Sequence, residues 1–398
     1  MPAVRASYAK RAISGASLPP YYARMAEHPL VQVAHDLAPF IRGHAGANEQ
    51  ARRLSAPVVE ALRPTGLFRM CVPAVYGGPE VPVLDMLRAI EAVAEADGAT
   101  GWCVNISSTT SSLASYLSPE WAREIFSDPL GAYGGAFAPN GKGRSVDGGW
   151  LVDGHWMWGS GTQHCHWVNG GVMTDKGELR LMFFPAADVT FLDTWRASGL
   201  RGTGSLDYEV HGAFVPAGRE VHVGKVWSQV DSPVSRFPNF NLLAAGLAAV
   251  CLGIGRRAID EAIALVTTKT ATLARTKVAE YGPAQLAIAN AEAILGAARA
   301  FLFDEVGRVW ESVVRGERPD VAQKARIRLA CAHVATESAR AVDLAYNTGG
   351  GSSVFESSPL QRCFRDIHTA TQHMMLSDRN MVTYARVRFG LEADTALL

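Results

Sequence analysis

The chain has 398 residues, 48% of them hydrophobic and 19% charged, which suffices for two or three domains with a large core and excludes a disordered chain. Lysine plus arginine equal aspartate plus glutamate at 38 each, and this balance argues against nucleic acid or an anionic membrane as a partner. The six cysteines have no Cys-x-x-Cys spacing, and neither a secretory signal nor an apolar run of about 20 residues stands out, so we expect reduced thiols in a cytoplasmic protein without membrane spans.

The first third of the chain predicts an arm followed by a helical domain. Residues 1–27 are expected to form a loose N-terminal arm, and residues 28–130 a helical domain. Apolar residues between 84 and 94 recur on one helical face, with charged residues opposite. The uncharged stretch 101–117 predicts a buried helix, and Ser118-Pro119-Glu120 has the capping serine and early proline of another helix start.

Residues 131–225 predict a central β domain, because glycine becomes frequent and apolar and polar residues alternate in short runs. The expected strands are 150–158, 165–174, 179–185, 189–193 and 206–215. Asp147-Gly148-Gly149 and Asp175-Lys176-Gly177 have the composition of hairpin turns.

Residues 226–398 predict a C-terminal helical bundle. The segment is rich in alanine, and Leu243, Leu247, Val250 and Ile254 have heptad-like spacing. Breaks at 282–283, 316–319 and 347–353 separate four expected long helices. The order of helical, β and helical blocks indicates an α+β multi-domain chain, and no Gly-x-Gly-x-x-Gly follows a strand, which argues against a Rossmann nucleotide site.

The segment 154–167 is the part of the sequence most indicative of a ligand. It contains three Trp, three His, one Cys, one Ser and three Gly within fourteen residues. Two interpretations stay open, an aromatic wall with a hydroxyl for a planar ligand and a tryptophan-rich corner of the β-domain core. His164 and His166 share one face of the expected strand, but no third ligand lies near them in sequence, so no metal site is predicted.

Three further segments resemble the acyl-CoA dehydrogenase superfamily. They run from Glu60 to Gly78, from Ser198 to Pro216, and from the glycine turn Gly349-Gly350-Gly351 through Arg362 to Asp366. The resemblance covers nearly the whole chain beyond the arm. It implies the acyl-CoA dehydrogenase fold, with a helical N-terminal domain, a β-barrel-like centre and a C-terminal four-helix bundle, assembled as a homotetramer.

The dehydrogenases of this superfamily use a glutamate base, which this chain lacks. Met374 stands where the glutamate of the last helix is expected, and Thr276 stands at the alternative position after Arg275. Abstraction of an α-proton needs a carboxylate or a comparable base, so a dehydrogenase is disfavoured.

The chain instead resembles the two-component (group D) flavin-dependent monooxygenases. These carry a Trp-x-Phe-x-Ser-Gly-x-x-His-x-x-Trp run. This chain has Trp156, Trp158, Ser160, Gly161, His164 and Trp167 in that arrangement, with Trp in place of Phe at 158. Gly101-Trp102 after an Asp-Gly-Ala-Thr turn and a histidine after Arg365-Asp366 are also typical. One departure is that the helix after Trp102 has no histidine, which some phenol hydroxylases place against the substrate hydroxyl.

This resemblance implies the oxygenase component of a two-component system. It receives reduced FMN or FAD from an NAD(P)H-dependent flavin reductase, forms a C4a-hydroperoxide with O₂, and hydroxylates an aromatic, phenolic or polycyclic substrate. The site must exclude water so that this adduct is not lost as hydrogen peroxide. N- or S-oxygenation on the same fold, an enzyme acting on an acyl thioester, and a non-catalytic flavin-binding protein remain as alternatives.

The resemblance also assigns residues. Ser160 is predicted to bond flavin N5, and His373, with His368 as a second candidate, to act in acid–base chemistry. The predicted cofactor contacts are Trp158, Ser160, Gly161, Thr203, Ser205, Arg275, Gln285 and Gly350, and the predicted substrate pocket is Trp102, Asn105 and His164. Arg275 is expected to meet the flavin phosphate of a neighbouring subunit, and Arg365-Asp366 to form a structural ion pair. A turn hydroxyl, helix histidines and a surface arginine are the non-functional alternatives for Ser160, the two histidines and Arg275.

Overall fold

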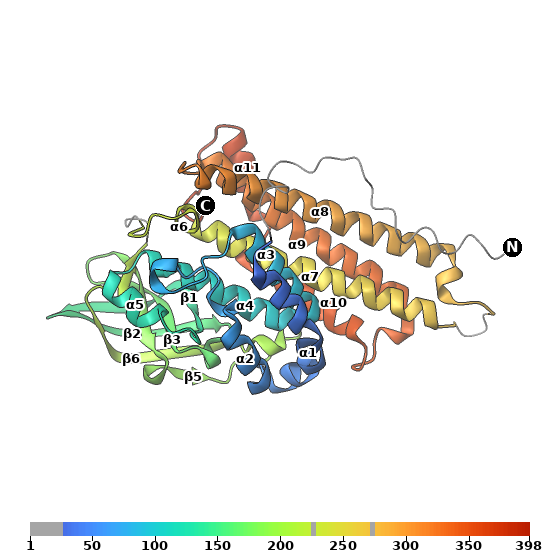
Figure 1. The fold of residues 1–398 in the computed structure, drawn as a ribbon, viewed down its shortest axis with the longest axis horizontal. Helices are drawn as coiled ribbons and strands as arrows, with labels where there is room; N and C mark the ends of the chain where they lie inside the picture. Colours follow the sequence, from blue (N-terminus) through green and yellow to red (C-terminus); the bar gives the residue numbers. More distant parts are fainter. Residues whose placement is uncertain (1–26, 224–227, 271–274) are drawn as a thin grey trace.

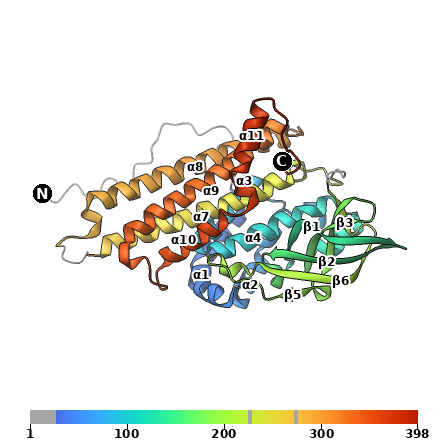
Figure 2. The same cartoon turned by 180° about the vertical axis from the view of Figure 1, so that it is seen from behind.

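The computed structural model describes residues 27–223, 228–270 and 275–398. A β-sheet occupies one end of the molecule, and long helices extend from it to the other end (Figures 1 and 2). Except for Glu27, the predicted arm 1–27 lies outside the described residues, and so does the predicted domain boundary at 225/226.

The N-terminal domain is helical, as predicted. Its helices are α1 (Pro29–Ala51), α2 (Ala56–Leu62), α3 (Val83–Ala96), α4 (Gly98–Ser111) and α5 (Pro119–Phe126). The Ser118 side chain caps α5 by accepting from the backbone N–H of Trp121, with a proline in the first turn. Asp97 caps α4 in the same way through the N–H of Thr100. Nearly every residue of α4 is buried, which explains why this helix carries no charge.

The central domain is one mixed sheet. Its strands are β1 (Tyr133–Val146), β2 (Gly149–Gly159), β3 (Trp167–Thr174), β4 (Leu179–Pro185), β5 (Thr190–Leu192), β6 (Leu206–Pro216) and β7 (Glu220–His222). Among the described residues, these seven strands are ordered β5-β6-β2-β1-β3-β4-β7, and β1 and β3 are the parallel neighbours. The β2–β6 pairing is irregular between Trp156 and Gly159, at the end of β2 that faces the helices.

The C-terminal domain packs helices around α7. Its elements are α6 (Pro233–Arg236), α7 (Asn239–Thr268), α8 (Gly282–Val314), α9 (Val321–Gly349), α10 (Pro359–Ala370) and α11 (Arg379–Arg388). The expectation of four long helices is wrong in one respect, because the fourth, α10, ends at Ala370. The chain then makes a 3₁₀ turn, η12 (Met374–Leu376), before α11 begins. His373 is therefore the residue that precedes a turn and is not part of a long helix.

Two of these helices are long and apolar enough to meet the criteria for a membrane span, contrary to the expectation that no run approaches one. The apolar window of α7 is 89% buried by the surrounding elements, as is usual for a core helix. The window of α8 is only 28% buried, so its apolar face lies largely uncovered on this chain.

Helix α4 connects the sheet to the bundle by packing antiparallel to α7. Gly98 at its start lies against Ile254, and the Ser112 hydroxyl just beyond its end donates to Asn239 Oδ1. Between these two contacts Asn105 faces Gly246, where an added Cβ would lie 1.8 Å from Asn105 Oδ1. Close approach of α4 to α7 therefore requires glycine at 246.

We predict that Gly246→Ala destabilises the fold, because the new methyl group and the Asn105 carboxamide cannot both occupy the helix crossing. The expected loss in the free energy of unfolding is about 1–3 kcal/mol, typical of an overpacked core. Gly43→Ala in α1, where a Cβ meets nothing within 4 Å, is the control and should stabilise by up to about 1 kcal/mol. Urea denaturation of both variants checks this, and equal stabilities would contradict it.

Candidate functional site

A buried chain of hydrogen bonds joins three separate elements next to the end of β2. The Trp102 indole N–H of α4 donates to Ser160 Oγ at 3.1 Å. Ser160 Oγ lies 2.6 Å from Ser205 Oγ, which lies 2.6 Å from Thr203 Oγ1 at the end of η9 (Arg201–Thr203). The Thr203 hydroxyl donates to the Leu200 carbonyl at 2.8 Å. Four of the predicted site residues are thus brought into direct contact.

The direction of this chain follows from its two ends. Thr203 donates its only proton to a carbonyl, so it accepts from Ser205, and Ser205 in turn accepts from Ser160. Ser160 therefore receives the indole N–H, has committed its own proton to Ser205, and keeps one lone pair unused. The remaining capacity of the Ser160 hydroxyl is that of an acceptor.

The backbone around Ser160 is held in a tight, unusual turn. Trp158 has φ +62° and Gly161 has φ +71°, and the Gly161 N–H donates to the Thr203 carbonyl at 2.9 Å. A left-handed conformation is rare for tryptophan and is often found at functional sites. It turns the Trp158 indole outward, so that the side chain is 66% exposed.

The predicted aromatic wall is only partly correct. Trp156 is fully buried, stacks on Tyr208 at 5.3 Å and donates its indole N–H to the Gly171 carbonyl. It belongs to the β-domain core, as the alternative interpretation held. Of the tryptophans in β2, Trp158 is the one whose ring is available to a ligand.

His373 lies beside this hydrogen-bonded chain. Its ring meets Trp102 edge-on, with centroids 5.6 Å apart and planes at 68°. Its Nδ1 accepts from the Met375 N–H at 3.2 Å, so in the neutral imidazole the proton sits on Nε2. Burial lowers the pKa of His373 to about 4, and the nearby Arg328 guanidinium acts in the same direction. His373 is therefore a neutral donor at physiological pH.

His368 does not join the site, contrary to the prediction. Its Nε2 pairs with Asp343 Oδ1 at 2.9 Å, and its ring packs on Phe364. It faces α9 from the side of α10, whereas His373 lies three residues past the end of that helix and faces Trp102.

The other predicted pocket residues are placed deeper. His164 is in η7 (Thr162–His164), not on a strand, and its ring lies 5.3 Å from that of Phe68. Burial, with the Arg63 cation second, lowers its pKa to about 3. Asn105 is fully buried, and neither atom of its carboxamide has a hydrogen-bond partner. His166 contacts Asp128, and no cluster of three potential metal ligands occurs in the described part of the chain.

Arg275, Gln285 and Gly350 lie together at the end of the bundle, away from Ser160. Arg275 is exposed between α7 and α8, and Gln285 is exposed in the first turn of α8. Gly350 follows α9, where Lys269 at the end of α7 donates to the Gly349 carbonyl at 2.8 Å. The predicted cofactor contacts therefore form two separate groups, one where the end of β2 meets α4 and η9, and the other where α7, α8 and α9 are connected.

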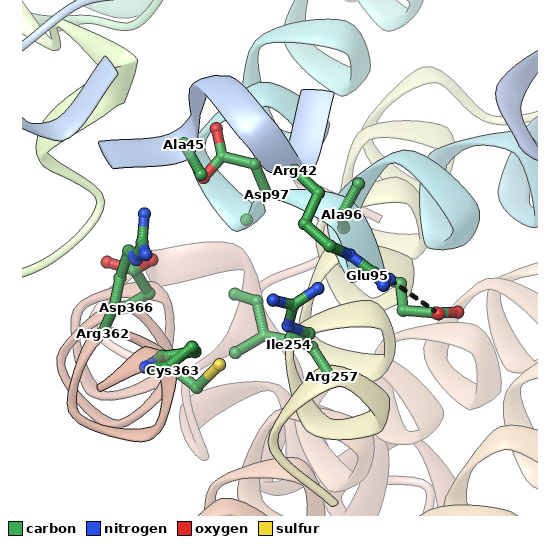
Figure 3. A pocket seen from close by; sticks show the side chains of 13 residues that line it. Arg42, Ala45, Glu95, Ala96, Asp97, Ile254, Arg257, Arg362, Cys363 and Asp366 are labelled. Carbon is green, nitrogen blue, oxygen red and sulfur yellow. Dashed lines mark ion pairs between the residues drawn. The ribbon is translucent and has the colours of Figure 1, made fainter. Parts of the chain in front are cut away.

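Arg365 and Asp366 do not pair with each other, contrary to the prediction. Arg365 pairs with Glu49 of α1, and Asp366 accepts from the Leu200 N–H at 2.6 Å. Asp366 lines a cavity of about 30 Å³ among α1, α3, α7 and α10. Figure 3 shows Arg42, Arg257 and Arg362 around this cavity, with Arg42 paired to Glu95 at 3.5 Å. No predicted cofactor or substrate residue lines it, so this charged cluster joins helices and does not mark the site.

Two residues next to the site, Arg328 and Asn380, were not predicted from the sequence. Arg328 is 2% exposed in α9 and donates to Asn380 Oδ1, which belongs to α11. One signal was present in the sequence, because Arg328 occupies the buried face of a helix between Ala325 and Ala332.

Comparisons with known proteins identify the family of the chain. Residues 32–127 match the model of the acyl-CoA dehydrogenase N-terminal domain, and residues 245–378 match that of its C-terminal domain. The indole-3-acetate monooxygenase of Pseudomonas putida is 30% identical over 355 residues, which cover 86% of this chain and 88% of that protein. The oxygenase subunit HsaA of a flavin-dependent monooxygenase from Rhodococcus jostii is 28% identical over 370 residues, 89% and 97% of the two chains.

A solved structure extends the match to the fold. XiaF from Streptomyces sp., in complex with FADH₂ and glycerol, has a TM-score of 0.86 and 25% identity, covering 92% of this chain and 96% of that one. The chain belongs to the acyl-CoA dehydrogenase superfamily, in its flavin-dependent monooxygenase branch. The monooxygenase is thus an oxidoreductase and the oxygenase component of its system, with flavin as the cofactor.

The charged cluster of Figure 3 gives a pH-dependent prediction. Burial raises the pKa of Asp366 to about 7 in the folded monooxygenase, so the folded state holds a proton that the unfolded state has released above pH ~4. Stability from this group is therefore lost as pH rises from about 4 to about 7, and no more is lost above that. The free energy of unfolding of Asp366→Asn, relative to that of the wild type, should therefore increase by roughly 1–3 kcal/mol between pH 5 and pH 8. Urea denaturation at both pH values measures it. Parallel pH profiles for the two proteins would contradict the assignment.

Proposed function

We propose that this chain hydroxylates a small aromatic substrate with reduced FMN or FAD delivered by a separate NAD(P)H-dependent flavin reductase. Reduced flavin supplies two electrons to O₂, so that one oxygen atom enters the substrate and the other leaves as water. The Ser160 hydroxyl chain carries this proposal, because it is buried and polarised in one direction, and because the family resemblance assigns Ser160 to flavin N5. We also propose a cytoplasmic location, which fits six free, buried thiols.

The residues around Ser160 fit a reduced flavin in particular. Reduced flavin carries a hydrogen on N5 and oxidised flavin does not, so the reduced form donates where the oxidised form accepts. Ser160 has given its proton to Ser205 and offers only a lone pair. It therefore complements the reduced cofactor, whereas an oxidised cofactor would leave two acceptors facing each other, which costs about 1–3 kcal/mol for a buried group.

Trp158 and Gly161 would hold the cofactor's flat ring. The outward indole of Trp158 supplies an apolar stacking surface, and Gly161 leaves no side chain between the turn and a bound ring. Thr203 and Ser205 act through Ser160 in this proposal and not by direct contact. They were predicted to contact the cofactor directly. In this proposal they instead set the direction of the hydrogen bonds that end at Ser160.

His373 would serve the substrate side of the site. As a neutral imidazole with its proton on Nε2, it donates a hydrogen bond to a substrate oxygen, and it accepts no proton on Nδ1, which is already occupied. Trp102 lies between His373 and Ser160 and separates the two polar groups with an apolar ring. Phe137 and Phe240, whose rings are 5.4 Å apart, would add apolar surface for an aromatic substrate, since Arg328 contacts both the Phe240 carbonyl and Met375 of η12. Together with the buried helix α4, these rings would exclude water.

We further propose that the enzyme is a homotetramer in which α8 is the contact between subunits. Its uncovered face presents Leu286, which is 63% exposed, followed by Ala289, Ala293 and Ala297 at helical spacing. A second copy of this chain is the proposed occupant, because Arg275, Gln285 and Gly350 lie at the connections between α7, α8 and α9, whereas Ser160 lies against Trp102 near the start of α4. In an assembly they would contact the flavin phosphate held by a neighbour.

The proposed reaction is tested by mixing the protein with reduced flavin, O₂ and a panel of phenols and indoles. We expect hydroxylated product in proportion to the O₂ consumed, with little hydrogen peroxide for the best substrate. If the protein instead binds oxidised FAD tightly, and an acyl-CoA reduces that FAD, the protein is a dehydrogenase and the proposed function is wrong.

The polarity of Ser160 gives a sharper prediction. Ser205→Ala frees the Ser160 proton, so the preference for reduced over oxidised flavin should fall about threefold to tenfold, the value of one hydrogen bond. Anaerobic and aerobic flavin titrations measure the two dissociation constants. Thr162→Val is the matched control, because Thr162 is a buried hydroxyl of the same turn that donates to Gly159 and lies outside the chain. An unchanged ratio in Ser205→Ala would remove the polarity argument.

The α8 contact predicts that Ala293→Glu breaks the assembly, because it places a charge in a desolvated apolar interface. Light scattering should give the mass of a smaller species, with flavin affinity reduced through loss of Arg275 from the neighbour's site. Met173→Glu on β3 is the control for an exposed apolar residue elsewhere. If both variants keep the mass of the wild type, α8 is not the interface.

A further inference from the structure

Arg328 is a buried cation without a carboxylate partner. Its side chain lies in α9 at 2% exposure, and no ion pair with Asp or Glu is found for it among the described residues. Arg326, two residues earlier on the same helix, pairs with Glu305 in the usual way. A buried, uncompensated charge costs several kcal/mol, so its retention calls for a physical reason.

Each of the three guanidinium nitrogens instead has a neutral partner. Nε and Nη2 donate to Asn380 Oδ1 at 3.1 and 2.5 Å, and Nη1 donates to the Phe240 carbonyl at 3.3 Å and contacts Met375 Sδ. The Asn380 amide then donates to the carbonyls of Met374 and Ser377, at 3.1 and 2.8 Å. Arg328 and Asn380 therefore fix both ends of η12.

This turn sets the orientation of His373. The Met375 N–H that binds Nδ1 belongs to η12, and so does the Leu376 N–H that donates to the His373 carbonyl at 2.8 Å. If η12 shifts, the donor to Nδ1 moves and the imidazole is no longer held as the Nε2–H form. The contact between His373 and Trp102 would change with it.

We propose that Arg328, acting with Asn380, is a positioning residue that keeps His373 neutral and aims its Nε2–H into the site. Its relevance to catalysis rests on the proposed function, but the effect on His373 does not. The uncompensated charge is useful here, because a cation near the imidazole disfavours a second positive charge.

The surroundings of His373 leave Arg328 as its charged neighbour. Helix α7 faces η12 with the segment 239–255, which has no Asp, Glu, Lys, Arg or His. Helix α4 contributes the Trp102 ring, and α11 contributes the neutral Asn380 beside the exposed Arg379. The pKa of His373 is lowered first by burial and then by Arg328.

The test uses flavin-free protein with isotope-labelled histidine, in which His373 is assigned by comparison with His373→Asn. Nuclear magnetic resonance gives the tautomer and the protonation midpoint directly. The wild type should hold its proton on Nε2 and titrate near pH 4. In Arg328→Gln the proton affinity of His373 should rise about threefold or more, while burial keeps the midpoint below 6.5. Arg328→Lys should keep the low midpoint, because the positive charge remains. It should lose the single tautomer, because an ammonium lacks the planar set of donors that holds Asn380 and η12.

Arg326→Gln is the matched control, since it removes an arginine from the same helix without touching η12, and it should leave the His373 signal unchanged. If Arg328→Gln fails to fold, Asn380→Asp serves instead. It keeps the acceptor for Arg328, supplies the missing negative charge and should raise the His373 midpoint. The inference is overturned if either folded variant leaves the midpoint and tautomer of His373 as in the wild type.

A second readout links this effect to turnover. Product formed per O₂ consumed should fall in Arg328→Gln and stay at the wild-type level in Arg326→Gln. A wild type that forms no product from any substrate would count against the proposed function alone, because the resonance measurement needs no flavin. If Arg328→Gln changes the midpoint or tautomer of His373 but leaves the product formed per O₂ unchanged, Arg328 positions His373 without affecting the reaction. That result would contradict the relevance of Arg328 to catalysis.

Discussion

The hydrogen bond from Trp102 to Ser160 is the contact on which the site depends. It joins α4 of the first domain to the end of β2 in the second, and it occupies one lone pair of a hydroxyl whose proton is already committed. The other features of the site adjoin one of these two residues. The left-handed turn at Trp158 places Ser160, the η9 segment sets its polarity, and the edge of the Trp102 ring meets His373. The antiparallel packing of α4 on α7, which needs glycine at 246, keeps this tryptophan in place.

The site combines two polar groups of opposite character in an apolar setting. Ser160 offers an acceptor, whereas His373 offers a donor, and a tryptophan ring lies between them. A hydroxyl or a neutral imidazole can both donate and accept, so the acceptor role of Ser160 and the donor role of His373 are set by their hydrogen-bond partners. A buried site of this kind has little water to reorganise, so the direction of each hydrogen bond matters more than it would on a surface. A cofactor that changes from donor to acceptor at N5 on oxidation is distinguished by such an arrangement.

Much of the fold was predictable, since apolar periodicity, caps and turns act locally. The Ser118 cap, the Asp147-Gly148 hairpin and the uncharged α4 are examples in which adjacent residues determine the structure. Ser160, Thr203, Ser205 and Trp102 were also named from sequence, through a resemblance and not through spacing. What failed depends on three-dimensional neighbours. His368 faces Asp343 of the neighbouring α9, Trp156 packs into the core on the same face of β2 as Trp150 and Val152, and Arg365 pairs with Glu49 from a distant helix. Arg328 was missed because the sequence does not reveal that its partners are neutral, whereas Arg326 of the same helix pairs with Glu305.

The central claim is that the Ser160 lone pair accepts from N5–H of a reduced flavin beside Trp158 and His373. An anaerobic crystal structure with reduced flavin tests it most directly. The account predicts N5 at about 3 Å from Ser160 Oγ, the usual distance of such a bond, with Ser160 still paired to Ser205 and His373 Nε2 facing the same space. A flavin whose N5 meets another group, or a Ser160 that has turned away from Ser205 to donate, would contradict it.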